Sequence, residues 1–114
     1  MFATKVRSTC EALGVVSRPA RNAAMLTARL DRVDDGKPND AVAAVLVDLD
    51  AEDALELIAL ATAHETQTPV VAFGPHVAVE LLQQAAESGA DPVMTRGRFT
   101  AELPALIQRY ASGG

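Results

Sequence analysis

The chain has 114 residues, the size of one domain, and 49% of them are hydrophobic, but only 4% are aromatic, so aliphatic side chains must fill the core. Its net charge of −5 argues against nucleic-acid binding, because phosphate contacts need clustered Lys and Arg. A single cysteine excludes an internal disulfide and fits a reducing compartment. Neither a signal peptide nor the apolar run of ~18 residues that a membrane span needs is recognisable. We therefore expect a cytoplasmic protein without a membrane partner.

The first third of the chain has two helical patterns. Apolar residues at helical spacing predict a helix over residues 2–13 that stops at Gly14. Val15 and Val16 then fit a brief buried strand. Asn22 is placed to cap a second helix that ends at Leu30. Residues 34–40, rich in turn formers, predict a loop.

From residue 41 onward, strands and helices alternate. The run AVAAVLVDL over residues 41–49 is typical of a strand buried on both faces of a parallel sheet. The later pattern predicts helices over 53–65, 76–88 and 100–110, with strands over 70–73 and 92–95. Alternation of this kind implies right-handed crossovers and a parallel sheet with helices on both faces. The sequence therefore predicts a three-layer α/β domain.

Two stretches resemble a known family. One is AVLVDLD at residues 44–50, which is followed by a predicted helix. The other runs from TPVVAFG at 68–74 through ESGADPVMTRGRFTAELPALI at 87–107. The order Gly-Ala-Asp, short strand, Thr-Arg, Phe and last helix is similar to the end of the receiver domain of bacterial response regulators. The resemblance implies a flavodoxin-like parallel sheet in one receiver-like domain over 1–110, with its usual first strand present or absent, and a flexible tail over 111–114.

The resemblance also implies a role for Asp48, which matches the position of the phosphoacceptor. Receivers need further groups, because an anion attacks a phosphoryl group only when cations neutralise the developing charge. Here the chain begins after the place of the acidic pair that binds Mg²⁺ in receivers. Where receivers have a Ser or Thr, this chain has Phe73 and Gly74, which offer no hydroxyl. Arg96 stands where receivers have a Lys. We therefore expect a degenerate receiver, or pseudo-receiver, without enzymatic activity, catalytic residues or a bound metal.

Three functions stay open at this point. The first is a non-catalytic signalling module that contacts an unidentified protein or a second copy, with Arg98 and Phe99 on the partner surface and Phe99 as its anchor. The second is a working receiver that phosphorylates Asp48 with Mg²⁺ as cofactor. The third is a small-molecule site at the carboxyl edge of the sheet. The residues predicted to contact an anion or ligand there are Asp50, Gly74, His76 and Arg96.

Some of these residues also have a simpler structural interpretation. Asp48 is expected to be a strand-end acid that pairs with Arg96. His76, at the start of a predicted helix, is expected to be solvated. Cys10 is expected to be a small core residue and not a nucleophile.

Overall fold

The computed structural model describes residues 2–17, 22–31, 33–34, 37–38, 42–64 and 66–111. Its helices and strands are, in chain order, α1 (Phe2–Ala12), α2 (Ala23–Leu30), β1 (Val33–Asp34), β2 (Lys37–Pro38), β3 (Val45–Asp48), α3 (Ala54–Ala63), β4 (Val70–Gly74), α4 (Val79–Glu87), β5 (Val93–Thr95) and α5 (Arg96–Ala111). Within this described part, no helix is long and apolar enough to cross a membrane.

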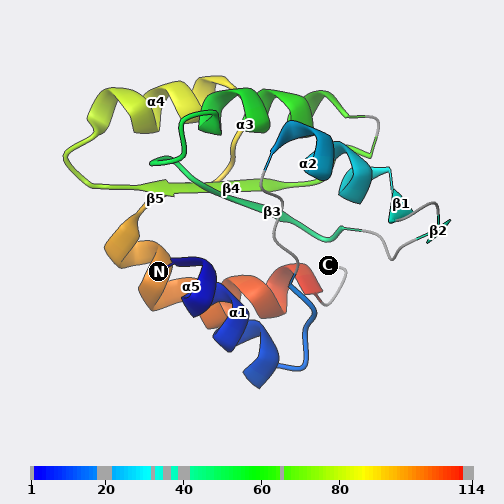
Figure 1. Ribbon diagram of the computed structural model, residues 1–114. Coiled ribbons are helices and arrows are strands. Elements are labelled where there is room, and N and C mark those ends of the chain that lie inside the picture. Colours follow the sequence, from blue (N-terminus) through cyan, green and yellow to red (C-terminus); the bar gives the residue numbers. More distant parts are fainter. Residues whose placement is uncertain are drawn as a thin grey trace.

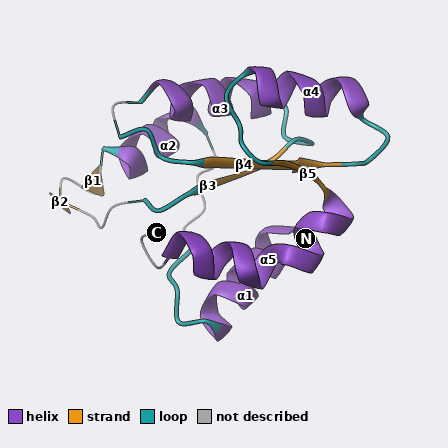
Figure 2. Ribbon diagram, turned by 180° about the vertical axis from the view of Figure 1, so that it is seen from behind, coloured by secondary structure: helices purple, strands orange, loops and turns teal. Residues whose placement is uncertain are grey.

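A parallel three-stranded sheet forms the middle layer of the molecule. Its strand order is β3-β4-β5, whereas β1 and β2 form a separate antiparallel pair. Helices α2, α3 and α4 cover one face of the sheet, and α1 and α5 cover the other (Figures 1 and 2). The predicted three-layer α/β fold with a parallel sheet is therefore confirmed. The register aligns Asp48 with Phe73 and Gly74 with Thr95, so the three strands end at the same edge.

Strand β4 lies at the centre of the sheet, and all of its residues are buried. Alternate side chains of a strand point to opposite faces. Val70 and Ala72 accordingly join the core under α2, α3 and α4, and Val71 and Phe73 join the core under α1 and α5. The apolar run of β4 thus supplies both layers, as a buried parallel strand requires.

The predicted cap of the second helix is confirmed. Asn22 has an extended backbone, and its Oδ1 accepts the N–H of Met25 at 2.8 Å. This hydrogen bond satisfies one of the N–H groups that the first turn of a helix leaves without an intrahelical partner.

The predicted strand at Val15 and Val16 is wrong. Gly14 has a positive φ of 72° and ends α1, and the N–H of Val15 reaches back to the carbonyl of Cys10 at 2.8 Å. The N–H of Gly14 donates to the carbonyl of Glu11 at 3.2 Å. These two bonds make a Schellman motif, so the backbone of Val15 closes a helix. Val15 packs on the core beside Cys10, whereas Val16 is 77% exposed.

Several predicted boundaries also differ from the structure. Helix α4 begins at Val79 and not at residue 76, and β3 covers only the end of the predicted strand over 41–49. The predicted loop over 34–40 contains part of the β1–β2 pair, and residues 35–36 and 39–41 lie outside the described chain. Ala111 is the last residue of α5, whereas the flexible tail was predicted over 111–114. Residues 112–114 lie outside the described residues.

Candidate functional site at the carboxyl edge of the sheet

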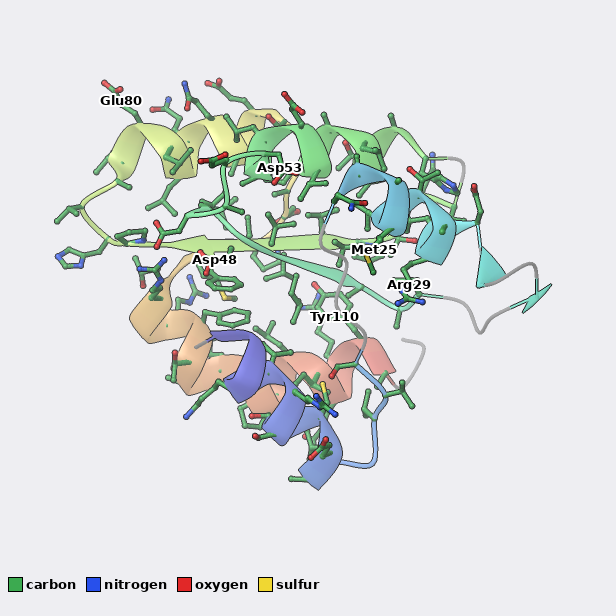
Figure 3. All side chains as sticks on the ribbon, viewed as in Figure 1. Met25, Arg29, Asp48, Asp53, Glu80 and Tyr110 are labelled. Atoms are coloured by element: carbon green, nitrogen blue, oxygen red, sulfur yellow. The ribbon has the colours of Figure 1, made fainter. Side chains whose placement is uncertain are left out.

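Two acids and one arginine meet at the edge where the strands end. Asp48 is the last residue of β3, and Asp50 lies in the turn that follows. Arg96 directly follows β5 and opens α5. Figure 3 shows Asp48 at this end of the sheet, beside the start of α5. The crossover connections therefore bring together residues that are 46 and 48 positions apart in the chain.

The guanidinium of Arg96 bridges both carboxylates. Its Nη2 donates to Asp48 Oδ1 at 3.2 Å and also to Asp50 Oδ2. Asp48 Oδ1 in addition accepts the backbone N–H of Asp50 at 3.0 Å. The turn after β3 is therefore tied both to its own strand and to the first residue of α5. The expected pairing of Asp48 with Arg96 is confirmed.

Charge at this site is partly balanced by a residue of the chain itself. The hydrogen bond with Asp50 raises the pKa of Arg96 above its ordinary value, desolvation acts in the opposite direction, and Asp48 adds to the rise. A guanidinium is always charged in proteins and matches carboxylate geometry. One cation thus faces two anions, where a divalent ion would otherwise balance them.

Helix α5 begins at Arg96 because Thr95 caps it. Thr95 Oγ1 accepts the N–H of Arg98 at 3.4 Å. The predicted start of this helix near residue 100 is therefore too late. The early start fixes the backbone of Arg96 at the end of β5, and this position directs its side chain across the strand ends to the two acids.

Gly74 lies at the same edge, but it has a packing role. It is the buried last residue of β4, and a Cβ atom placed on it would come 3.2 Å from the Cβ and Cδ1 of Leu49. Since Leu49 is buried between Asp48 and Asp50, this close approach helps set the turn that carries both acids. His76 is exposed in the turn between β4 and α4, as its solvated interpretation predicted.

The prediction that Phe99 is an exposed anchor is wrong. Phe99 is 0% exposed, and its ring stacks on that of Phe73 with centroids 3.9 Å apart. Arg98 is exposed, as a surface residue should be, and its Nε donates to Glu102 Oε2 at 2.6 Å. Cys10 is a buried core residue, as expected, and burial raises the pKa of its thiol.

A second polar cluster, at the opposite edge of the sheet, was not predicted. His64, only 12% exposed, contacts Asp31 Oδ1 through Nε2 at 2.6 Å and Thr66 Oγ1 through Nδ1 at 2.9 Å. The N–H of Thr66 also donates to Nδ1, and Thr66 Oγ1 lies 3.0 Å from the hydroxyl of buried Thr68. The cluster joins the ends of α2 and α3. No local pattern signals it, because Asp31 and His64 are 33 residues apart.

Metal binding has little support in the described part of the chain. No group of three or more His, Cys, Asp or Glu side chains is placed there to hold an ion. Asp48 and Asp50 form a pair of oxygen donors, which suits Mg²⁺, but Arg96 lies between them.

Comparison with solved structures gives the fold a name. The chain matches the phosphorylated cyanobacterial phytochrome response regulator RcpA with a TM-score of 0.70 and 16% identity, over 98% of this chain and 89% of that one. It matches a response regulator from Thermotoga maritima with a TM-score of 0.67 and 20% identity, over 96% and 87%. The fold is that of a response-regulator receiver domain.

The same receiver fold occurs within a larger protein. NtrX from Brucella abortus, solved in complex with ADP, matches with a TM-score of 0.71 and 20% identity, over 99% of this chain and 24% of that chain. No protein-family model matches the chain, and no curated protein sequence is similar to it. At these low identities the likeness concerns the receiver fold alone.

Proposed function

We propose that this chain is a non-catalytic signalling module of the receiver fold, which acts through contacts with another protein and has lost the phosphorylation switch. The observation that carries this proposal is the bridge from Arg96 to both Asp48 and Asp50. In a working receiver, these carboxylates would be available to a divalent ion and a phosphoryl donor. Here the guanidinium of Arg96 already occupies the space between them and offsets part of their charge.

The bridge has a mechanical consequence for such a module. It connects the turn after β3 to the start of α5, and Gly74 packs against the same turn from the end of β4. All three strand ends are therefore held in one arrangement without a ligand. A partner that binds here meets a constant surface, and regulation would come from the amount of the partner or of this chain.

The residues next to the site support the loss of phosphoryl chemistry. Strand β4 ends in Phe73 and Gly74, so no hydroxyl stands at the end of the central strand beside Asp48. Arg96 presents a planar fork that is already engaged, where a compact ammonium would be free to move to a phosphoryl oxygen.

One observation favours the alternative of a working receiver. The Asp48 side chain is partly exposed and lies at the end of its strand, so a small phosphodonor has access to it. The small-molecule alternative gains no support from the hollow at α4, which is lined by α4 and the turn before it, and not by Asp48 or Arg96.

Beryllofluoride with Mg²⁺, a mimic of the phosphoryl group, separates the two accounts. We expect the amide NMR spectrum of the chain to stay unchanged on its addition. Shifts that centre on residues 48–51 and disappear in Asp48→Asn would overturn the proposed function and establish a working receiver.

A further inference from the structure

Charge is distributed unevenly along the chain. Residues 42–95 contain no Lys or Arg, although they carry nine acids: Asp48, Asp50, Glu52, Asp53, Glu56, Glu65, Glu80, Glu87 and Asp91. All ten basic residues lie before or after this segment. This segment forms the three strands of the sheet as well as α3 and α4, so the surface of α3 and α4 carries acidic side chains and no basic ones, whereas Arg29 lies on α2 in the same layer. Figure 3 shows Asp53 and Glu80 on this side.

The same layer also exposes apolar side chains. Val77 is 76% exposed in the turn after β4, and Val79 is 66% exposed at the first position of α4. A hollow of about 480 Å³ opens among residues of this segment, with Glu80 on its lining. The lining residues are Val77, Ala78, Val79, Glu80, Leu81 and Gln84. A hollow that exposes two valines beside an acidic residue has the composition of a docking site for a segment that is both apolar and basic.

We propose that this surface, defined by the six lining residues, binds an amphipathic, Lys- and Arg-rich helix of a partner protein. The inference rests on the proposed function, because it names the surface and the partner chemistry of the signalling module. Apolar side chains of the partner cover Val77 and Val79. Its basic side chains face Glu80 and the other acids of α3 and α4, which steer the encounter.

The acidic side chains around this surface argue against other binding partners. A second copy that used the same surface in a symmetric dimer would bring two acidic surfaces together, and like charges across an interface are costly. A nucleic acid would be repelled for the same reason. An acidic or neutral apolar peptide would gain the valine contacts but no electrostatic attraction. A basic amphipathic helix alone satisfies both features of the surface.

The surface lies next to the site of the proposed function without sharing its residues. Gly74 ends β4 and packs on the turn between Asp48 and Asp50, and the exposed valines follow it closely in the chain. The Arg96 bridge therefore helps hold the base of the turn that presents Val77. Substitutions of the valines leave the bridge intact, so the two proposals can be tested separately.

Two synthetic helical peptides provide the probe, one built of Leu and Lys and a matched one built of Leu and Glu. We expect the Lys peptide to shift the amide signals of residues 77–84 of the ¹⁵N-labelled chain in a saturable way, and the Glu peptide to leave them unchanged. Val77→Ser together with Val79→Ser should weaken binding about tenfold, since each lost valine contact removes apolar burial. Val16→Ser, at an equally exposed valine outside this surface, is the control and should bind as the wild type does.

Three results would overturn the inference. These are no shift with the Lys peptide, shifts spread over the chain with no loss in the double valine variant, and equal binding of both peptides. If the valine variant proves unfolded by circular dichroism, Glu80→Gln measured at low and high salt takes its place. That variant should weaken binding at low salt, and an unchanged affinity counts against the surface. The beryllofluoride experiment reports on Asp48, so its result does not depend on any of these outcomes.

Discussion

The rings of Phe73 and Phe99 stack almost parallel, with an interplanar angle of 10° and centroids 3.9 Å apart. Phe73 comes from the central strand, and Phe99 comes from the first turns of α5. The contact therefore fixes α5 against the sheet close to the residue, Arg96, whose side chain reaches the acidic pair. In a chain with few aromatic residues, this stack is a principal connection between the two layers.

Phe99→Ala tests this connection. Removal of a fully buried aromatic side chain leaves a cavity, so we expect the free energy of unfolding to fall by about 3–5 kcal/mol. Arg98→Ala, at the neighbouring exposed position, removes only a surface ion pair and should change it by less than about 1 kcal/mol. Urea unfolding measures both. An equal, small effect of the two substitutions would contradict the burial of Phe99.

Substitution of Gly89 and of Gly97 by alanine should change the stability of the fold in opposite directions. Gly89 has φ of +112°, and a Cβ atom there would lie 2.7 Å from Thr62 Cγ2, so Gly89→Ala should destabilise the fold by about 1–3 kcal/mol. Gly97 lies in the first turn of α5, and a Cβ atom there would meet nothing within 4 Å beyond its chain neighbours and the backbone of its own helix, so Gly97→Ala should stabilise the fold by about 0.5–1 kcal/mol. Thermal unfolding compares the two. Effects of the same sign would contradict the positive φ and the close approach at Gly89.

The sequence was sufficient for the layers and the parallel sheet, because apolar strand runs are local signals. It was sufficient for the Asp48–Arg96 pair because both residues lie at the ends of predicted strands, and parallel strands end at one edge of a sheet. The orientation of Phe99 was not predicted, because the helix was expected to begin near residue 100. Once α5 begins at Arg96, Phe99 falls on the same helical face as Leu103 and Leu106, and burial follows. The helix predicted over 76–88 would have included both Val77 and Val79. The later start of α4 leaves Val77 in a turn, and both valines are exposed.

The Asp31–His64 contact was invisible in the sequence for a different reason. It joins two helix ends that only the tertiary fold brings together. We expect His64→Ala to lower the free energy of unfolding by about 1–2 kcal/mol, because Asp31 and Thr66 lose a mostly buried partner. A double-mutant cycle with Asp31→Ala measures the pair directly. Strictly additive effects of the two substitutions would mean that the contact contributes nothing.

Cys10 provides a test that depends on pH. Burial raises the pKa of its thiol above the ordinary value of 9.0, although a hydrogen bond with Ser17 acts in the opposite direction. The folded chain therefore favours the neutral thiol. Its stabilising contribution is complete below the unfolded pKa and is lost as the pH rises through the folded pKa.

Two measurements follow from the raised pKa. The native chain should react with iodoacetamide more slowly than the urea-unfolded chain at the same pH, since the thiolate is the reactive form. In the alkaline range, the wild type should also lose stability relative to Cys10→Ala as the pH increases. Equal alkylation rates for the folded and unfolded chains would contradict the buried environment of Cys10.

The most direct test of the account is a Mg²⁺ titration of the wild type and of Arg96→Met, followed by the amide signals of residues 48–51. If Arg96 occupies the place of a metal ion between Asp48 and Asp50, the wild type should show no saturable shift. Arg96→Met should then bind Mg²⁺ with a dissociation constant on the order of 1 mM, typical of a weak carboxylate site. Arg98→Met, on the same helix, should behave as the wild type does. Saturable Mg²⁺ binding by the wild type, unchanged in Arg96→Met, would contradict the account.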